Sequence, residues 1–235
     1  MTNPFLFISC TQASSEKAES LLIVQSFKEV ADFTGARLEM VWENKEGLSK
    51  VYNRKILEYQ NSGVEYLVFV HDDVFIDDLK VCAKIKLAHQ RFGFELIGVA
   101  GGVNPCFEAN AEWHRLCLGT ERRGAICHMA KGMILLPTTF GFTPSPVTIL
   151  DGVFMAVHLP SILKKGWRFN ENYEFHHYDL SSCLDAAAKG MLLGVFPIHL
   201  QHASGGLSSY DDPSWVKSNA KFLAEYPLPR RKVSK

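Results

Sequence analysis

The chain has no excess of charge of either sign, because Lys plus Arg and Asp plus Glu each number 25 among its 235 residues. A broad basic surface of the kind that binds nucleic acid is therefore not expected. A small phosphorylated ligand is compatible with this balance, because a few local charges or a metal ion can hold it. With 47% hydrophobic residues, the chain can bury a sizeable core.

Zinc motifs, secretion signals and long apolar runs are also missing. The sequence contains no CxxC, HxxxH or HxH pair, so no preformed metal cage is predicted. The N-terminus lacks the basic region and apolar length of a signal peptide, and no run approaches a membrane span. Several of the six cysteines lie in apolar runs, which predicts buried thiols in a reducing compartment. We therefore expect a cytoplasmic protein without a transmembrane segment. The cysteines are Cys10, Cys82, Cys106, Cys117, Cys127 and Cys183.

No Pro/Ser-rich linker, repeat or low-complexity run divides the chain, which predicts a single domain over residues 1–235. In residues 5–102, apolar stretches predict strands at 5–8, 38–42, 65–70 and 96–100. Gly101 and Gly102 are expected to end the strand at 96–100. Helical spacing of apolar residues predicts a helix from residue 15 that Gly35 closes, a second helix at 48–59 and a third that begins after Asp78. This order implies an α/β fold with a mostly parallel central sheet flanked by helices, which is a Rossmann-like arrangement suited to nucleotides.

The pattern breaks over residues 103–131, where aromatic, cysteine and charged residues mix over a stretch longer than ordinary loops. We expect a loop here that acts as a lid. The second half, residues 132–212, is expected to contain a strand near 147–157, a helix at 180–189 and a strand at 191–198. A C-terminal helix and tail are expected over 213–235.

The apolar strand that ends at Val70 runs directly into paired carboxylates, Asp72 and Asp73. This places negative charge at the carboxyl end of a sheet, where open α/β folds bind ligands. Adjacent carboxylates repel one another unless a cation or a proton lies between them, and a divalent ion is the usual solution. The alternative is a turn of solvated acids that continues to Asp77 and Asp78.

Alternation of side chains along a strand places His71 and Asp73 on one face and Asp72 on the other. His71 and Asp73 are therefore the pair expected to face a ligand. Near the end of the chain, His202 follows another strand and precedes a glycine-rich turn at 204–206. It is a second candidate ligand and ranks above His199, although a lone histidine after a strand is more often a loop residue.

Asp179 lies directly ahead of the helix expected at 180–189. Asp in this position is a favoured N-cap, whose carboxylate accepts hydrogen bonds from backbone N–H groups. Close to a metal-bound diphosphate, the same carboxylate could instead deprotonate an incoming hydroxyl as a general base. Both interpretations stay open at this point.

Four motifs follow one another along the chain, and in this order they resemble the nucleotide-sugar glycosyltransferases of GT-A type. The narrower resemblance is to a family-2-like branch that includes a streptomycin-biosynthesis protein, and it spans about residues 5–206. The motifs are Val70-His71-Asp72-Asp73-Val74, Leu150-Asp151-Gly152-Val153-Phe154-Met155-Ala156, Phe175-His176-His177-Tyr178-Asp179-Leu180 and His202-Ala203-Ser204-Gly205-Gly206.

The resemblance implies a metal-dependent enzyme that moves a sugar from a nucleoside-diphosphate sugar to an acceptor hydroxyl. Inversion is the expected course, and retention stays open. The acceptor is a saccharide, a lipid-linked molecule or a small molecule that the sequence does not identify. The implied cofactor is Mn²⁺ or Mg²⁺.

By the same resemblance, the metal-binding DxD motif of the family falls on His71, Asp72 and Asp73. Asp73 is implied to bind the metal and Asp72 to take the variable middle place on the donor side. His71 replaces the first Asp of the motif. His202 matches a late histidine that completes the metal coordination, and Asp179 matches the catalytic base.

The remaining implied positions lie around the two substrates. Tyr178 stands where the family has a Glu before the base, and Asp151 and Gly152 lie where the acceptor-side strand enters the site. Residues 132–212 are thus the implied acceptor half. The positions that fall near the nucleoside are Thr11, Glu43, Tyr52 and Asn53.

Two other function classes fit parts of the sequence. A metal-dependent phosphoesterase or hydrolase could be built from five residues, although their spacing does not form a cage. A binding module could hold a nucleotide sugar without turning it over, and the departures at His71 and Tyr178 favour it. The five hydrolase candidates are His71, Asp73, His176, His199 and His202.

Overall fold

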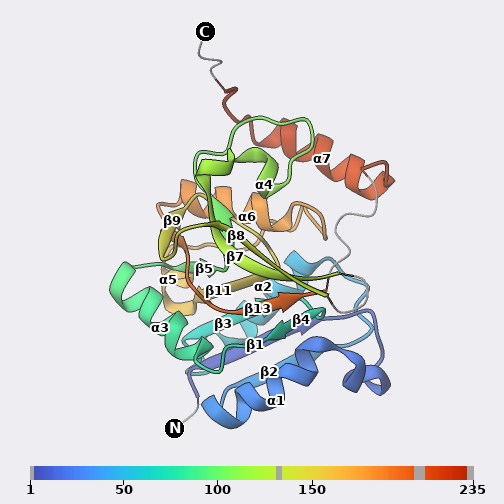
Figure 1. The fold of residues 1–235 in the computed structure, drawn as a ribbon, viewed down its shortest axis with the longest axis vertical. Helices are drawn as coiled ribbons and strands as arrows, with labels where there is room; N and C mark the ends of the chain where they lie inside the picture. Colours follow the sequence, from blue (N-terminus) through green and yellow to red (C-terminus); the bar gives the residue numbers. More distant parts are fainter. Residues whose placement is uncertain (1–2, 131–133, 204–209, 232–235) are drawn as a thin grey trace.

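The computed structural model describes residues 3–130, 134–203 and 210–231. Seven strands form its central sheet in the order β2-β1-β3-β11-β5-β12-β9 (Figure 1). Their bounds are β1 Phe5–Cys10, β2 Arg37–Val41, β3 Tyr66–Val70, β5 Leu96–Gly98, β9 Ser145–Val147, β11 Phe154–His158 and β12 Leu193–Val195.

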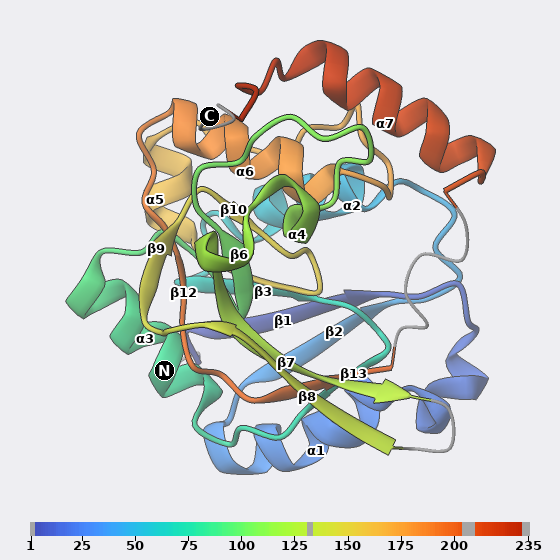
Figure 2. The ribbon, with the colours of Figure 1, turned by 45° about the horizontal axis from the view of Figure 1, so that its top comes forward.

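A second sheet of six strands has the order β10-β6-β7-β13-β4, with β8 paired to β7 outside this path. Figure 2 shows β7, β8 and β13 crossing in front of β1 and β3. The bounds are β4 Val74–Ile76, β6 Ala100–Gly102, β7 Arg122–Ala130, β8 Ile134–Gly141, β10 Ile149–Leu150 and β13 Leu200–His202.

Helices cover both sides of the central sheet, with α1 on one side, α2 and α6 on the other, and α7 outside α6 (Figures 1 and 2). The bounds are η1 Ser15–Ser20, α1 Leu22–Thr34, α2 Leu48–Tyr59, α3 Val81–Phe92, α4 Trp113–Leu116, η2 Gly119–Glu121, α5 Leu159–Lys164, α6 Tyr178–Ala188 and α7 Pro213–Glu225. The η elements are 3₁₀ turns.

The α/β class is confirmed, but the direction of the strands differs from the mostly parallel sheet that was expected. β1 pairs in parallel with β2 and β3, and β5 pairs in parallel with β12. β11 inserts between β3 and β5 and is antiparallel to both, and β9 is antiparallel to β12. β11 is buried along nearly its whole length, as a parallel strand would be, so its apolar pattern gives no sign of its direction.

Several element boundaries are set by close packing that the sequence pattern does not reveal. The strand expected at 96–100 is divided between the two sheets at Val99, as β5 and β6. Gly101 and Gly102 continue β6 instead of ending it. A Cβ atom at Gly101 would lie 2.2 Å from the carbonyl oxygen of Ile149, so only glycine allows β10 to pair here.

The loop expected at 103–131 is wrong in part, because it contains α4, η2 and strand β7. Its role as a lid stays a prediction. The single strand expected near 147–157 is interrupted by a turn at Asp151 and Gly152, and the helix expected from residue 15 starts as η1 before α1. α2 has the predicted bounds, and Gly35 ends α1 as expected, with a φ of 68° that glycine adopts at low cost.

Two expectations from the composition concern buried thiols and the absence of a transmembrane segment. All six cysteines are free thiols, and Cys82, Cys117 and Cys183 are buried. Within the described ranges, no helix combines the length and the apolar character that crossing a bilayer requires.

Asn53 joins α2 to the segment that leads into α6. Its amide nitrogen donates to the carbonyl oxygen of Phe169 and to Glu171 Oε1, both at 2.9 Å, and its Oδ1 accepts from the backbone N–H of Phe169 at 2.8 Å. Only 6% of Asn53 is exposed, so water cannot replace these bonds in a truncated variant.

Asn53→Ala is therefore expected to lower the free energy of unfolding by about 2 kcal/mol, because it leaves buried backbone groups unpaired. Urea denaturation followed by circular dichroism measures this change. The control is Asn61→Ala, which truncates an exposed asparagine after α2. Equal midpoints for the two variants would contradict the prediction.

Candidate functional site

The acidic motif His71-Asp72-Asp73 follows β3, and its first two side chains face different cavities. The backbone N–H of His71 donates to the carbonyl oxygen of Val153 at 3.1 Å, which continues the pairing of β3 with β11 beyond Val70. His71 lines one cavity, and Asp72 lines the other. The opposite orientation of these neighbours follows the alternation expected for extended chain.

His202 reaches the acidic motif because β13 pairs antiparallel with β4, with His202 opposite Val74. His202 Nε2 lies 3.3 Å from Asp73 Oδ1. One ligand atom from each of His71, Asp73 and His202 lies within 4.8 Å of the other two. The structure thus brings together the three residues that the sequence suggested as metal ligands.

This trio fits a divalent cation. Asp73 Oδ1 and His202 Nε2 are both buried, and their 3.3 Å contact does not complete a hydrogen bond. Leaving such an atom unpaired costs about 1–3 kcal/mol, and a cation between them would remove that cost. Two imidazoles and one carboxylate suit a transition metal such as Mn²⁺ better than Mg²⁺, which prefers oxygen ligands.

The charges of the trio depend on one another. Burial opposes a charged ring at His202, but contact with Asp73 outweighs burial and raises the pKa of His202. Burial also opposes a charged carboxyl at Asp73, and the contact with His202 nevertheless lowers the pKa of Asp73. Burial lowers the pKa of His71, which Asp73 only partly offsets, so His71 is held in the neutral form that binds metals.

Asp179 lies in the first turn of α6, one residue after the helix start. The N-cap residue is His177, whose φ is 60°, so the expectation that Asp179 caps the helix is wrong. Asp179 Oδ2 accepts from the backbone N–H of Gly152 at 2.9 Å, and Oδ1 accepts from that of Leu180 at 2.8 Å. Burial, together with the charge of Asp151, raises the pKa of Asp179 to about 7. A carboxyl with this pKa can accept a proton at neutral pH.

Asp179 and two members of the trio share a cavity of about 450 Å³. Its lining also includes the Asp151–Gly152 turn, Tyr178 and aromatic rings that arrive from other parts of the chain. The complete lining is His71, Ala111, Glu112, Trp113, His114, His128, Thr138, Phe140, Asp151, Gly152, Phe175, His176, His177, Tyr178, Asp179, Leu180, His202 and Trp215.

A second cavity, of about 600 Å³, lies on the other side of the acidic motif and is lined by Asp72, Thr11 and the loop around Gly47. Phe175 lines both cavities, so the two adjoin there. Its ring is 60% exposed and stacks on that of His71, with centroids 6.4 Å apart. An elongated ligand could therefore extend from Thr11 past the acidic motif to Asp179.

The turn between β10 and β11 connects the groups in the first cavity. Asp151 accepts from Trp113 Nε1 at 2.8 Å and from the backbone N–H of Val153 at 3.0 Å. The hydroxyl of Tyr178 donates to the carbonyl oxygen of Gly152 at 2.8 Å. The hydroxyl of Tyr178 thus bonds within the protein, and one short turn holds Asp151, Tyr178 and Asp179 in place.

The four positions expected near the nucleoside separate in the structure. Thr11 lines the second cavity, whereas Tyr52 and Asn53 are buried and line neither cavity. The ring of Tyr52 packs on Phe69, with centroids 4.4 Å apart. Glu43 is exposed, and its backbone N–H donates to Ala13, a residue of the second cavity.

The histidines of the hydrolase alternative do not form one centre. His176 lines the first cavity, but His199 lines a third cavity that also contains Asp77. His199 therefore does not join His202 in the trio. The expected turn at 204–206 lies outside the described residues.

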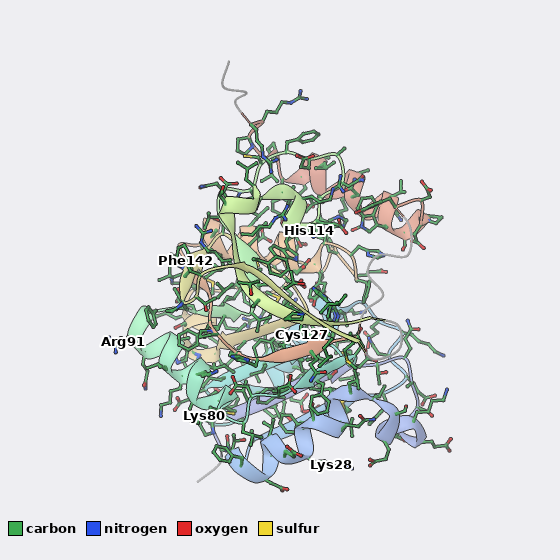
Figure 3. The ribbon with its side chains drawn as sticks, viewed as in Figure 1. Lys28, Lys80, Arg91, His114, Cys127 and Phe142 are labelled. Carbon is green, nitrogen blue, oxygen red and sulfur yellow. The ribbon has the colours of Figure 1, made fainter. Side chains whose placement is uncertain are left out.

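Several residues of the first cavity gave no usable signal in the sequence. Trp113 stands in the irregular stretch 103–131, where an aromatic residue is as easily explained by surface packing, yet its Nε1 donates to Asp151. His128 lies opposite His202 in the pairing of β7 with β13. Figure 3 shows His114, a residue of α4, in the upper part of the view, far from Lys28 and Lys80 near α1 and α3. The described lining of the first cavity contains no Lys or Arg.

Comparison with known proteins gives a family and two similar structures. A family model described as "Glycosyltransferase like family" matches residues 6–231. A search of curated proteins gave no match. The chain is similar to the structure of A197 from STIV, with a TM-score of 0.47 and 11% identity over 85% of this chain and 82% of that one. It is also similar to S. aureus TarS 1-349, with a TM-score of 0.48 and 13% identity, and spans 60% of that chain with 85% of its own.

The raised pKa of Asp179 predicts a pH-dependent effect of Asp179→Asn on stability. In the wild type, the unfolded state loses the proton near pH 3.8 and the folded state near pH 7, so the free energy of unfolding falls as the pH rises through this window. The variant has no carboxyl at this position, so it does not lose stability in this way as the pH rises. Its stability relative to the wild type should therefore increase from pH 4 to pH 8, by on the order of 4 kcal/mol.

Melting temperatures of both proteins at pH 4, 6 and 8 measure this difference. Asp32→Asn, which changes an exposed carboxyl on α1, is the control and should show a constant difference. The prediction is contradicted if the difference for Asp179→Asn is also constant.

Proposed function

Because the chain belongs to the Glycosyltransferase-like family and has a GT-A-type fold, we propose that it transfers a sugar from a nucleoside-diphosphate sugar to an acceptor hydroxyl. The observation that carries this proposal is the shared cavity, in which His71 and His202 of the metal trio face the same space as Asp179. We also propose that the protein belongs to the narrower branch of the family that includes a streptomycin-biosynthesis protein. The transferred sugar is proposed to be a hexose. A cytoplasmic location is part of the same proposal.

The donor is proposed to extend across both cavities. The nucleoside lies in the second cavity, where Thr11 and Asp72 offer polar atoms, with Glu43 beside it. The diphosphate lies at the acidic motif, and the sugar enters the first cavity. Tyr52 and Asn53 act behind this surface, through packing and hydrogen bonds that hold α2.

His71, Asp73 and His202 are proposed to hold Mn²⁺ rather than Mg²⁺. A divalent cation in this place stabilises the negative charge that gathers on the nucleoside diphosphate as it leaves. The three side chains contribute a single formal negative charge when both imidazoles are neutral, so they leave positive charge on the cation for the diphosphate. His71 is held neutral by burial, as this arrangement needs.

Asp179 is proposed to act as the general base of an inverting transfer. The acceptor oxygen forms a bond to the anomeric carbon, the bond from that carbon to the diphosphate oxygen breaks, and Asp179 takes the hydroxyl proton. The neighbouring charge of Asp151 and burial both raise the proton affinity of Asp179. The N–H groups of Gly152 and Leu180 fix the orientation of its carboxylate.

The metal and the nucleotide are tested together by calorimetric titration with UDP, GDP, dTDP and CDP, each with and without Mn²⁺. We expect one nucleotide to bind only when Mn²⁺ is present. In Asp73→Ala this binding should fall below detection, because the variant removes the only carboxylate of the trio. Asp77→Ala is the matched control, since it removes a nearby acid whose side chain bonds to Gln201.

Normal metal-dependent binding by Asp73→Ala would overturn the assignment of the metal site. Cleavage of a generic aryl phosphate without nucleotide preference would instead favour a hydrolase. Nucleotide-sugar binding without transfer or donor hydrolysis would favour a binding module.

Asp179→Asn separates binding from catalysis. The variant keeps the shape of the side chain but cannot accept the acceptor proton, so we expect transfer to slow by about 10²–10⁴-fold while nucleotide binding stays within a factor of two or so. Rates are measured as release of the nucleoside diphosphate in the presence of an acceptor. A variant with the wild-type rate would remove Asp179 from the mechanism.

A further inference from the structure

The hydroxyl of Tyr178 lies between the acceptor-side turn and the metal trio. Tyr178 is 3% exposed, and its ring packs against Tyr52 and Phe169. Its hydroxyl is 2.8 Å from the carbonyl oxygen of Gly152 and 3.1 Å from Nε2 of His71. This buried hydroxyl, which also lies beside the hydroxyl of Tyr52, must divide its bonding capacity among these neighbours.

Counting protons fixes the direction of both hydrogen bonds. A phenolic hydroxyl has one proton, and a carbonyl oxygen can only accept. The proton of Tyr178 must therefore point to Gly152, which leaves an oxygen lone pair facing His71. A hydrogen bond at that position requires His71 Nε2 to carry a proton and donate it. In a neutral imidazole with its proton on Nε2, the free lone pair is on Nδ1.

The position of the hydroxyl is itself tightly defined. A Cβ atom at residue 152 would lie 2.5 Å from the hydroxyl oxygen of Tyr178, so only glycine lets the hydroxyl reach the backbone here. Tyr178 is the first residue of α6, so helix α6 fixes its backbone. The resulting chain of bonds runs from His71 through Tyr178 to Gly152.

We propose that Tyr178 is a positioning residue for the metal site, which holds His71 as the Nε2–H tautomer so that Nδ1 faces the cation. This inference rests on the proposed metal site and does not depend on sugar transfer. It assigns Tyr178 a function different from the acceptor contact that the family resemblance implied. A partner that orients a ligating histidine commonly affects metal affinity by 10–100-fold.

The hydrogen-bond direction is tested in the metal-free protein by ¹⁵N NMR of the imidazole nitrogens. The chain has nine histidines, and the signals of His71 are identified by their loss in His71→Gln. We expect a protonated Nε2 and an unprotonated Nδ1, with an Nε2–H proton protected from exchange that is lost in Tyr178→Phe. A proton on Nδ1 in the wild type would overturn the proposal, whatever reaction the protein catalyses.

Metal affinity gives the second readout, measured as Mn²⁺ binding by electron paramagnetic resonance. Tyr178→Phe should bind Mn²⁺ at least about 10-fold more weakly than the wild type. In the His71→Gln background, the same change should have no further effect, because Tyr178 acts through His71. Equal losses in both backgrounds would show a structural effect and contradict the proposal.

Tyr173→Phe is the matched control. Tyr173 is 1% exposed, and its hydroxyl donates to Glu225 Oε2 at 2.9 Å, away from the trio. This variant loses a buried tyrosine hydroxyl as Tyr178→Phe does, so a similar loss of stability is expected in both. Only Tyr178→Phe should weaken Mn²⁺ binding, and weaker binding by Tyr173→Phe would count against the proposed link to His71.

Discussion

The ion pair between Asp73 and His202 is the interaction on which the site depends. It joins residues that are far apart in the sequence, and it exists because β13 pairs with β4, which follows the acidic motif. The contact between these two buried atoms does not complete a hydrogen bond, and a cation bound by both would satisfy them.

The turn at Asp151 and Gly152 organises the rest of the site around that pair. β11 enters the central sheet antiparallel beside β3, which brings the turn next to His71. Gly152 then bonds to Asp179 through its N–H group and to Tyr178 through its carbonyl oxygen. The proposed base Asp179 and the proposed metal ligand His71, from distant segments, thereby lie beside one backbone unit. The strand direction that the sequence did not predict is the feature that makes this possible.

Local patterns were sufficient for the parts of the structure that depend on local chemistry. The bounds of α2, the glycine that ends α1 and the opposite faces of His71 and Asp72 follow from periodicity and backbone preference. The order of four weak motifs was sufficient to suggest Asp73, His202 and Asp179, and the structure places them around adjoining space.

The sequence was insufficient where a residue's environment is formed by distant segments. Asn53 follows Tyr52 on α2, but the structure uses its amide to hold residues 169–171. Trp113 gave no signal, because nothing near it in the chain indicates a buried carboxylate partner. The place of Asp179 directly ahead of the expected helix favours an N-cap, but α6 begins at Tyr178, two residues earlier than expected.

The proposed site requires that one cation, bound by the trio, lies between the two cavities. Crystals grown with Mn²⁺ and the nucleoside diphosphate that binds best, with data collected near the manganese absorption edge, test it most directly. We predict an anomalous peak in contact with Asp73 and His202, with the diphosphate on its other side. A bound nucleotide without a peak there, or a peak coordinated by other residues, would contradict the account.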